Sequence, residues 1–180
     1  MNYLNAPAKL YIVNGKWYML RSLEPEDLEL LYTIENDASQ WWVSSQTAPL
    51  SRYQLRDYIA NNSADIYKDE QVRFVIEAEG TAVGLIDLFN FSAQHRRAEL
   101  GVAILSKYQH HGYARQAINE IMRYATDILS LKQIYAIVPV SNQSSRKMLL
   151  GAGFVESAVL HDWVRVKQSY DDAIVFQKVF

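Results

Sequence analysis

The stretch that most constrains the fold joins an apolar run, a short loop and an amphipathic helix. The apolar run covers residues 100–105 and contains Gly101, which is typical of a buried strand. Over residues 115–129, apolar side chains recur at the three-to-four spacing of one helix face, at Ala117, Ile121, Tyr124, Ala125 and Ile128. The sequence therefore predicts a strand, a turn and a helix in direct succession.

The loop between this strand and helix has the features of an anion-binding turn. Its small residues, Gly112 and Ala114, lie two apart where the helix begins. At such a junction, free backbone N–H groups converge and the helix dipole favours negative charge. The glycine spacing fits neither a dinucleotide fingerprint nor a P-loop. Two interpretations stay open, ordinary turn chemistry and binding of a phosphorylated ligand.

Composition and charge narrow the possible functions. The 180 residues predict one domain over 1–180, with residues 1–16 as an N-terminal extension. The net charge of −2 argues against nucleic-acid binding through a broad basic field and is compatible with a cationic small molecule. The absence of cysteine excludes disulfides, thiolate metal sites and a cysteine nucleophile. No apolar segment is long enough for a membrane span and no secretory signal begins the chain, so we expect a cytoplasmic protein without a membrane partner.

The remaining pattern predicts an α/β fold of the α+β type, with one mostly antiparallel central sheet and helices on both faces. Asn14-Gly15 between two β-prone runs predicts an N-terminal hairpin. Helices are expected from Pro25 to Glu35 and after Ser51. Further strands are expected at residues 72–79, 83–91, 97–105, 133–138, 154–160 and 172–179, with a connection at 163–170 and a helix from Asn142 to Leu150.

Two segments resemble the hallmark motifs of the GNAT family of acetyl-CoA-dependent N-acetyltransferases. The loop from Gln109 to Ala114 resembles the family's Gln/Arg-x-x-Gly-x-Gly/Ala pyrophosphate loop, and Asn142 with Ser145 resembles its Asn-and-Ser helix. The longer pattern, which includes His95 to Glu99 and Tyr170 to Ala173, is similar to the spermidine N-acetyltransferase and ribosomal-protein alanine N-acetyltransferase branch. The resemblance covers roughly Trp17 to Phe180.

The resemblance implies acetyl-CoA as cosubstrate and assigns residues to it. Backbone groups of Val102 and Ile104 are expected to pair with the pantetheine amides, and Asn142 and Ser145 to contact the pantetheine or adenosine arm. The pyrophosphate is expected on the loop formed by Gln109, His110, His111, Gly112, Tyr113, Ala114 and Arg115. The two histidines contribute mainly backbone groups, and no suitably spaced partner ligand accompanies them, so no metal site is expected.

In this family an amine attacks the thioester directly, and the amine must first lose a proton. A lysine-like amine has a pKa of about 10 in water, and a carboxylate acting directly or through water is the usual base. By resemblance Asp87 is the leading candidate, with Glu35 and Asp37 as alternatives. Asp87 is equally consistent with a solvated or hydrogen-bonded strand carboxylate.

The sequence departs from the family pattern at the residue that protonates the leaving thiolate. Relatives of this type carry a tyrosine acid seven residues after the capping Asn, where this chain has Leu149. Leucine cannot donate a proton. Either Tyr170 or Ser145 replaces the tyrosine, or the thiolate leaves unprotonated, since a thiol pKa of about 8.5 lies close to neutrality.

The expected acceptor site consists of Glu35, Asp37, Trp41, Asp87 and Asn90. Polyamine acetyltransferases place several acidic residues here, whereas this chain has none over residues 41–46 and Asn90 replaces another. The tryptophans at 41 and 42 either line the cleft or are buried.

Three functions follow from these features: acetylation of a polyamine such as spermidine, acetylation of a protein N-terminus or amino sugar, and acetyl-CoA sensing without turnover. We also expect a homo-oligomer. The leader from Met1 to Val13, with its hairpin, exceeds the family's usual start and either covers an edge strand or joins a neighbouring subunit.

Overall fold

The computed structural model describes residues 11–13, 16–38, 47–166 and 168–180. Within these ranges one sheet of eight strands has the order β1-β2-β3-β4-β5-β6-β8-β7. The strands are β1 (Tyr11–Val13), β2 (Lys16–Arg21), β3 (Val72–Ala78), β4 (Thr81–Ser92), β5 (Arg97–Ile104), β6 (Gln133–Pro139), β7 (Val155–Val166) and β8 (Ser169–Val179). Every neighbouring pair is antiparallel except β5 and β6. The predicted mostly antiparallel sheet is therefore confirmed.

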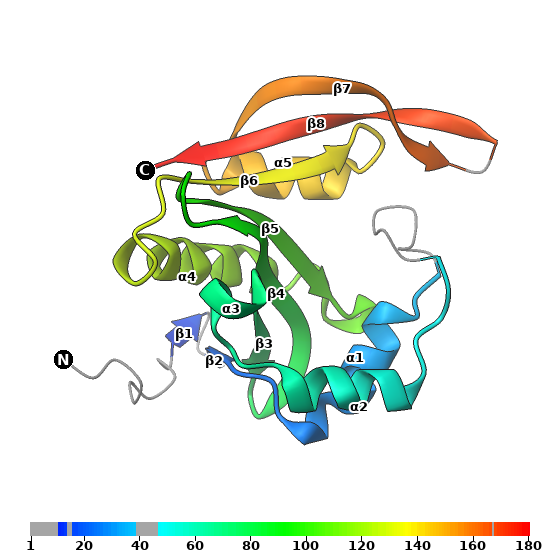
Figure 1. Ribbon diagram of the computed structural model, residues 1–180, viewed down its shortest axis with the longest axis vertical. Helices are drawn as coiled ribbons and strands as arrows, with labels where there is room; N and C mark the ends of the chain where they lie inside the picture. Colours follow the sequence, from blue (N-terminus) through cyan, green and yellow to red (C-terminus); the bar gives the residue numbers. More distant parts are fainter. Residues whose placement is uncertain (1–10, 14–15, 39–46, 167) are drawn as a thin grey trace.

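The parallel pair β5–β6 divides the sheet into two parts. Their pairing joins Arg97–Glu99 to Gln133–Tyr135, and beyond these residues the strands diverge (Figure 1). Strands β1 to β5 lie on one side of the opening, and β6, β8 and β7 lie on the other. A splayed pair leaves backbone N–H and C=O groups on the strand edges without a neighbouring strand. The opening is the feature that positions the functional site.

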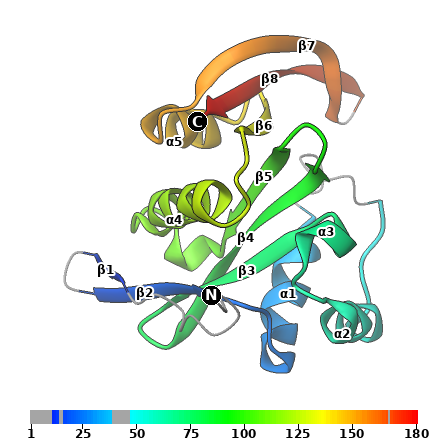
Figure 2. The same cartoon turned by 60° about the vertical axis from the view of Figure 1, so that its left-hand side comes forward.

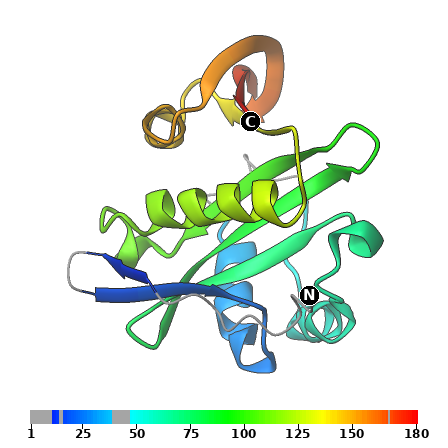
Figure 3. The same cartoon turned by 90° about the vertical axis from the view of Figure 1, so that its left-hand side faces the viewer.

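Helices cover both faces of the sheet, as predicted. They are α1 (Leu28–Glu35), α2 (Arg52–Asn61), α3 (Ile66–Asp69), α4 (Tyr113–Asp127) and α5 (Gln143–Gly151). Figure 2 shows α4 on one face of β2–β5 and α1 with α2 on the other. Figure 3 shows α5 beside the strands β6–β8–β7, apart from the other helices.

Two hydrophobic clusters hold these layers together. The larger cluster lies under α4 and α5 and includes Ile118, Ile121, Phe154 and Phe176, all at most 2% exposed. The smaller cluster joins α1 and α2 to the opposite face through Leu31, Leu55, Val75 and Leu85. Burial of a leucine- or phenylalanine-sized side chain is worth about 1.5–3 kcal/mol, so both clusters fix the helices firmly on the sheet.

Local sequence signals account for most helix starts. Ser51 accepts a hydrogen bond from the backbone N–H of Gln54 in a capping box at the start of α2. Asn142 caps α5 in a similar way by accepting from the N–H of Ser145. Pro25 occupies the first turn of a 3-10 segment (Pro25–Asp27) that leads into α1. These predicted starts are confirmed.

The structure also corrects two expectations and adds one short helix. Residues 163–170 are not a connection, because β7 and β8 form a long hairpin that includes them up to the turn. The register shifts between Leu160 and Val164, and Asp162 has φ 49°, so the alternation of side chains is interrupted there. The short helix α3 was not predicted from the sequence. Ile128, expected on the buried face of the central helix, is 50% exposed because it follows the last turn of α4.

Near the N-terminus, β1 and β2 pair antiparallel with Val13 opposite Lys16. The predicted hairpin is confirmed by this pairing, although its turn residues Asn14 and Gly15 lie outside the described residues. The chain then continues from β2 into α1, and β2 pairs with β3 on its other side. The hairpin therefore extends the sheet at the β1 edge, far from the opening between β5 and β6 (Figure 1).

Candidate active site

A large pocket lies where β5 separates from β6. We call it the central pocket, and its volume is about 1090 Å³. It is bounded by the end of α1, the strands β4 and β5, the turn that follows β5 (Ser106–Tyr108), and the first turns of α4 and α5. Ten of the eleven residues predicted for acetyl-CoA line it: Val102, Ile104, Gln109, His110, Gly112, Tyr113, Ala114, Arg115, Asn142 and Ser145. His111 does not.

One wall of the central pocket is the N-terminus of α4. Gly112 is the N-cap, with φ +86°, and His110 is also left-handed, with φ 63°. The first backbone hydrogen bond of the helix runs from the N–H of Gln116 to the carbonyl of Gly112. The N–H groups of the three preceding residues therefore have no acceptor within the helix. This arrangement provides the converging amides and positive dipole end that a phosphate requires.

A second wall is the free edge of β5. Leu105 donates its N–H to the carbonyl of Val83 on β4 at 3.0 Å. Since backbone groups alternate in direction along a strand, Val102 and Ile104 direct theirs away from β4 and toward the opening. The Gln109 side chain donates to the Ile104 carbonyl at 3.1 Å. The edge can therefore pair with an extended ligand that carries amide groups.

The third wall comes from α5 and supplies polar and positive groups. Asn142, Ser144, Ser145 and Lys147 line the pocket on this side. Lys107 and Arg115 line it near the turn and the start of α4. Three cationic side chains and a helix N-terminus thus surround one region of the central pocket. Such a region favours a polyanionic ligand.

The opposite region of the pocket carries carboxylates. Glu35 is the last residue of α1, Asp37 follows the helix, and Asp87 comes from β4. Arg73 on β3 joins two of them, with Nη2 2.7 Å from Asp87 Oδ2 and Nη1 2.7 Å from Glu35 Oε1. The side chains of Arg73, Glu35 and Asp87 are 17%, 21% and 11% exposed. The structure therefore brings the three predicted acidic residues into one pocket, and an arginine joins two of them, Glu35 and Asp87.

Burial and charge act in opposite directions on this arginine. Burial lowers the pKa of Arg73, while the facing carboxylates Asp87 and Glu35 and the phenol of Tyr58 raise it, and the net result is a raised pKa. Arg73 is therefore a permanent cation. Its guanidinium carbon lies 5.5 Å from the ring centroid of Tyr58 on α2. For Tyr58 itself, burial raises the pKa and the charge of Arg73 partly opposes this.

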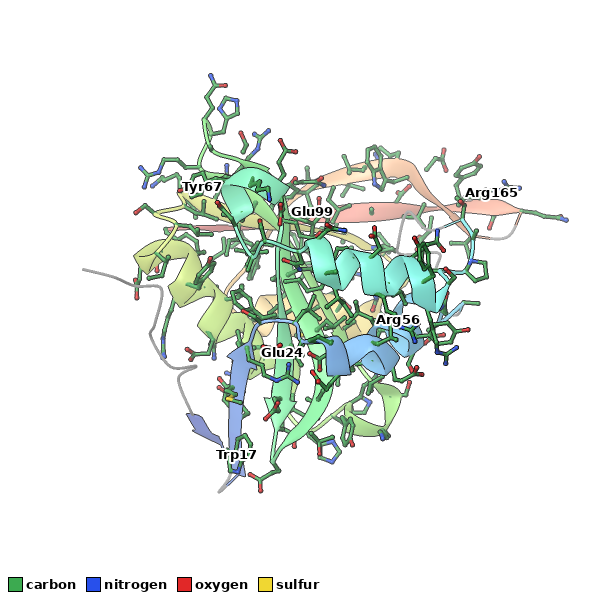
Figure 4. All side chains as sticks on the ribbon, turned by 60° about the horizontal axis from the view of Figure 1, so that its bottom comes forward. Trp17, Glu24, Arg56, Tyr67, Glu99 and Arg165 are labelled. Atoms are coloured by element: carbon green, nitrogen blue, oxygen red, sulfur yellow. The ribbon has the colours of Figure 1, made fainter. Side chains whose placement is uncertain are left out.

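Besides His111, two further predicted residues, Tyr170 and Asn90, do not line the central pocket, and a third, Trp41, lies outside the described residues. Tyr170 is 60% exposed and pairs with Arg165 near the tip of the β7–β8 hairpin, where Figure 4 labels Arg165. Asn90 donates instead to Glu99 Oε2 at 2.8 Å. Of these, Tyr170 is a poor candidate for the acid because it does not line the pocket and its side chain is mostly exposed.

Leu149 lies one helical turn beyond the pocket-lining Ser145, yet it is itself 2% exposed. It belongs to the larger hydrophobic cluster. The position that carries a tyrosine acid in the family pattern is therefore filled here by core packing. No proton donor is available from this side chain.

Sequence reasoning missed several pocket residues, above all Arg73, Gly101 and Lys147. Arg73 was visible as a cation between apolar residues of a strand, which is costly to bury unless it is paired. Its partners could not be identified, because they lie 14 and 38 residues away along the chain.

The histidines of the loop interact locally. His111 Nδ1 lies 2.7 Å from the carbonyl oxygen of Gln109, and the His111 ring stacks on Tyr113 with centroids 5.9 Å apart. Over the described ranges there is no group of three or more His, Cys, Asp or Glu side chains placed to hold a metal ion. Nor does any described helix have the length and apolarity needed to cross a membrane.

The sequence is similar to a known protein family and to characterised members of it. Residues 18–155 match the family model described as an acetyltransferase (GNAT) domain. The chain is 31% identical over 159 residues to spermidine N(1)-acetyltransferase of Escherichia coli strain K12, which covers 86% of this chain and 82% of that protein.

Solved structures agree with this likeness. The spermidine N-acetyltransferase of Vibrio cholerae in complex with CoA and spermine aligns with a TM-score of 0.78 and 28% identity, over 90% of this chain and 95% of that chain. A dodecameric structure of the Vibrio cholerae enzyme in an intermediate state aligns with a TM-score of 0.75 and 29% identity, over 90% and 93% of the two chains.

Proposed function

The chain belongs to the GNAT acetyltransferase family and is an acetyl-CoA-dependent acyltransferase, and from this premise we propose that it acetylates a primary amine of a polyamine such as spermidine. The observation that carries the proposal is the division of the central pocket. Cations and a helix N-terminus lie at one end, and three carboxylates lie at the other. A polyanionic donor and a cationic acceptor fit such a pocket together.

The donor end suits coenzyme A. The free amides at the start of α4 would hold its diphosphate, and Lys107, Arg115 and Lys147 would add positive charge. The edge groups of Val102 and Ile104 would pair with the amides of the pantetheine arm. When bound, acetyl-CoA supplies the acetyl thioester. The N–H of Ile104 is then the donor that we propose for the developing oxyanion.

The acceptor end suits an amine. Glu35, Asp37 and Asp87 line it, and the relatives named for spermidine support a polyamine acceptor. Because an ammonium must lose its proton before attack, we propose that Asp87 accepts this proton directly or through a water molecule. Positioned proton transfer of this kind is worth about 10²–10⁴-fold in rate.

The thiolate leaves without a tyrosine acid in this proposal. Leu149 is in the core and Tyr170 is outside the pocket. A thiol pKa of about 8.5 is within two units of neutrality, so protonation of the leaving group is worth at most about 2 kcal/mol at pH 7. The absence of an acid for the leaving thiolate therefore slows the reaction without abolishing it.

We also propose a homo-oligomer. The dodecameric relative supports it, as do the exposed apolar side chains of the β7–β8 hairpin, Val155, Val159 and Trp163, which are 60%, 51% and 56% exposed. Large apolar side chains gathered on one element are typical of a surface that another chain covers.

The test of the proposed function is release of free thiol from acetyl-CoA with four acceptors: spermidine, a peptide with a free N-terminus, an amino sugar and water. We expect release with spermidine well above that with water. Release only with the peptide or the amino sugar would replace the acceptor and keep the chemistry. Stabilisation by acetyl-CoA without release for any acceptor would instead indicate a sensor.

A further inference from the structure

The two oxygens of the Asp87 carboxylate have different surroundings. Oδ2 accepts three hydrogen bonds, from Arg73 Nε at 2.9 Å, Arg73 Nη2 at 2.7 Å and Gln71 Nε2 at 3.0 Å. Oδ1 faces Gly101, which is its cross-strand neighbour on β5. A carboxylate oxygen has about two lone-pair sites, so Oδ2 has no capacity left for a substrate.

Oδ1 lies in the space that a side chain at position 101 would occupy. A Cβ atom at this position would overlap Oδ1 and would also come within 3.2 Å of Phe89 Cε1. Gly101 lines the central pocket together with Asp87. Because any larger residue would displace the carboxylate, the glycine allows Asp87 to hold Oδ1 in the wall of the pocket, and Oδ1 is not among the fully buried unpartnered atoms of the described residues.

Arg73 fixes the whole arrangement. The same guanidinium that binds Asp87 Oδ2 through two nitrogens binds Glu35 Oε1 through the third. The charged and titratable groups that face Asp87 from neighbouring elements include Arg73 on β3, Glu35 on α1 and Tyr58 on α2. One cation between two carboxylates leaves one formal negative charge, which a positively charged amine can balance.

We propose that Arg73 is a positioning residue that presents Oδ1 of Asp87, across Gly101, as the atom that meets the acceptor's amine. The inference rests on the proposed function and extends it to two residues that nothing in the sequence pattern assigned. Arg73 does not touch the acceptor. It occupies Oδ2 and holds α1 beside β4, so that one oxygen in a fixed direction receives the N–H of the amine.

The first test is Gly101→Ala, with Gly151→Ala as the matched control. Gly151 has open space around the position of a Cβ atom and lies on α5, so its substitution leaves the pocket unchanged. Binding of spermidine is measured by calorimetry, and turnover by thiol release. We expect Gly101→Ala to weaken spermidine binding and to lower kcat/KM for spermidine at least tenfold, with unchanged stabilisation by acetyl-CoA. If Gly101→Ala binds spermidine and turns it over with the wild-type Kd and kcat/KM, the proposal is overturned.

The second test separates positioning from simple structural support. In Arg73→Gln the two carboxylates face each other without a cation, and like charges disfavour ionisation. We expect the acidic limb of the kcat/KM profile to move upward by roughly one pH unit or more. Arg73→Lys keeps the positive charge but lacks the planar guanidinium that binds both carboxylates. It should therefore restore part of the wild-type pH profile of kcat/KM. An unmoved profile in Arg73→Gln would overturn the proposal.

Failure of the proposed function would look different. If the wild-type protein binds spermidine and releases no thiol with any acceptor, catalysis is refuted, while the calorimetric comparison of Gly101→Ala still decides the inference. If the wild-type protein does not bind spermidine, the assignment of a polyamine's amine to Oδ1 is wrong.

Discussion

The side chain of Gln109 donates a hydrogen bond to the carbonyl oxygen of Ile104 at 3.1 Å. This bond ties the first residue of the anion-binding loop back to the free edge of β5. It closes the 3-10 turn between them, in which Tyr108 donates its N–H to Leu105 and Gln109 donates its N–H to Ser106. The loop is thereby held beside the strand edge before any ligand arrives, which lowers the ordering cost of binding.

Replacement of Gln109 should therefore weaken binding of acetyl-CoA. A neutral hydrogen bond is worth about 0.5–1.5 kcal/mol, so we expect Gln109→Ala to raise the Kd about three- to tenfold. The isosteric Gln109→Glu has no donor and adds a negative charge near the diphosphate, so its Kd should rise further. Calorimetry with acetyl-CoA measures both. Tighter binding by Gln109→Ala would mean that the side chain blocks the coenzyme.

Gly112 should be required for the loop conformation. Its φ of +86° is costly for a residue with a Cβ atom, by about 1–2 kcal/mol. Gly80, in the turn between β3 and β4, has φ +73° and provides a matched control away from the pocket. We expect Gly112→Ala and Gly80→Ala to lose similar stability in urea unfolding. Only Gly112→Ala should lose the thermal stabilisation given by acetyl-CoA, and an equal loss in both variants would contradict this account of the loop.

Leu149→Tyr should supply the missing acid at a cost in stability. Helical side chains point toward the N-terminus of their helix, so a tyrosine here would extend toward Ser145 in the pocket wall. Overpacking of the core should lower the free energy of unfolding by about 1–3 kcal/mol. We expect kcat to rise at pH 7 and the gain to vanish near pH 9, where the thiolate leaves unaided. Leu149→Phe provides the same bulk without the hydroxyl, and an equal gain in that variant would refute the role of an acid.

Asp172 should make the β7–β8 hairpin sensitive to acid. Its pKa is lowered by a hydrogen bond from the backbone N–H of Asp162 and by one from the ring of His161. A depressed pKa in the folded state stabilises the protein above the unfolded pKa of about 3.9, and this contribution is lost as pH falls through the folded value. Urea midpoints of the wild type and Asp172→Asn should differ above pH 5 and converge toward pH 2. A difference that stays constant from pH 2 to 6 would contradict the assignment.

The sequence predicted the fold well because its signals are local. The periodicity of α4, the caps at Ser51 and Asn142, and the alternating strands β3 to β5 each depend on residues a few positions apart. The β7–β8 hairpin was predicted too short because bulges interrupt its alternation. A bulge adds a residue without a distinct sequence signal.

The donor side of the candidate site was predictable from local sequence, and the acceptor-side carboxylates Glu35, Asp37 and Asp87, which line the pocket, were predicted from the family resemblance. The loop after β5 is continuous in sequence, and its glycine marks the left-handed N-cap. What could not be predicted is that Arg73 on β3 joins Glu35 on α1 to Asp87 on β4. Such a cluster arises from the register of β3 with β4, where Arg73 lies opposite Asp87. No local pattern encodes that pairing.

A crystal structure of the protein with coenzyme A tests the central claim most directly. The account predicts the diphosphate within hydrogen-bond distance of the backbone N–H groups of Tyr113, Ala114 and Arg115. It predicts the pantetheine arm along Val102 and Ile104, with its thiol directed toward Asp87. Coenzyme bound elsewhere, or a diphosphate that leaves these amides without contact, would contradict it.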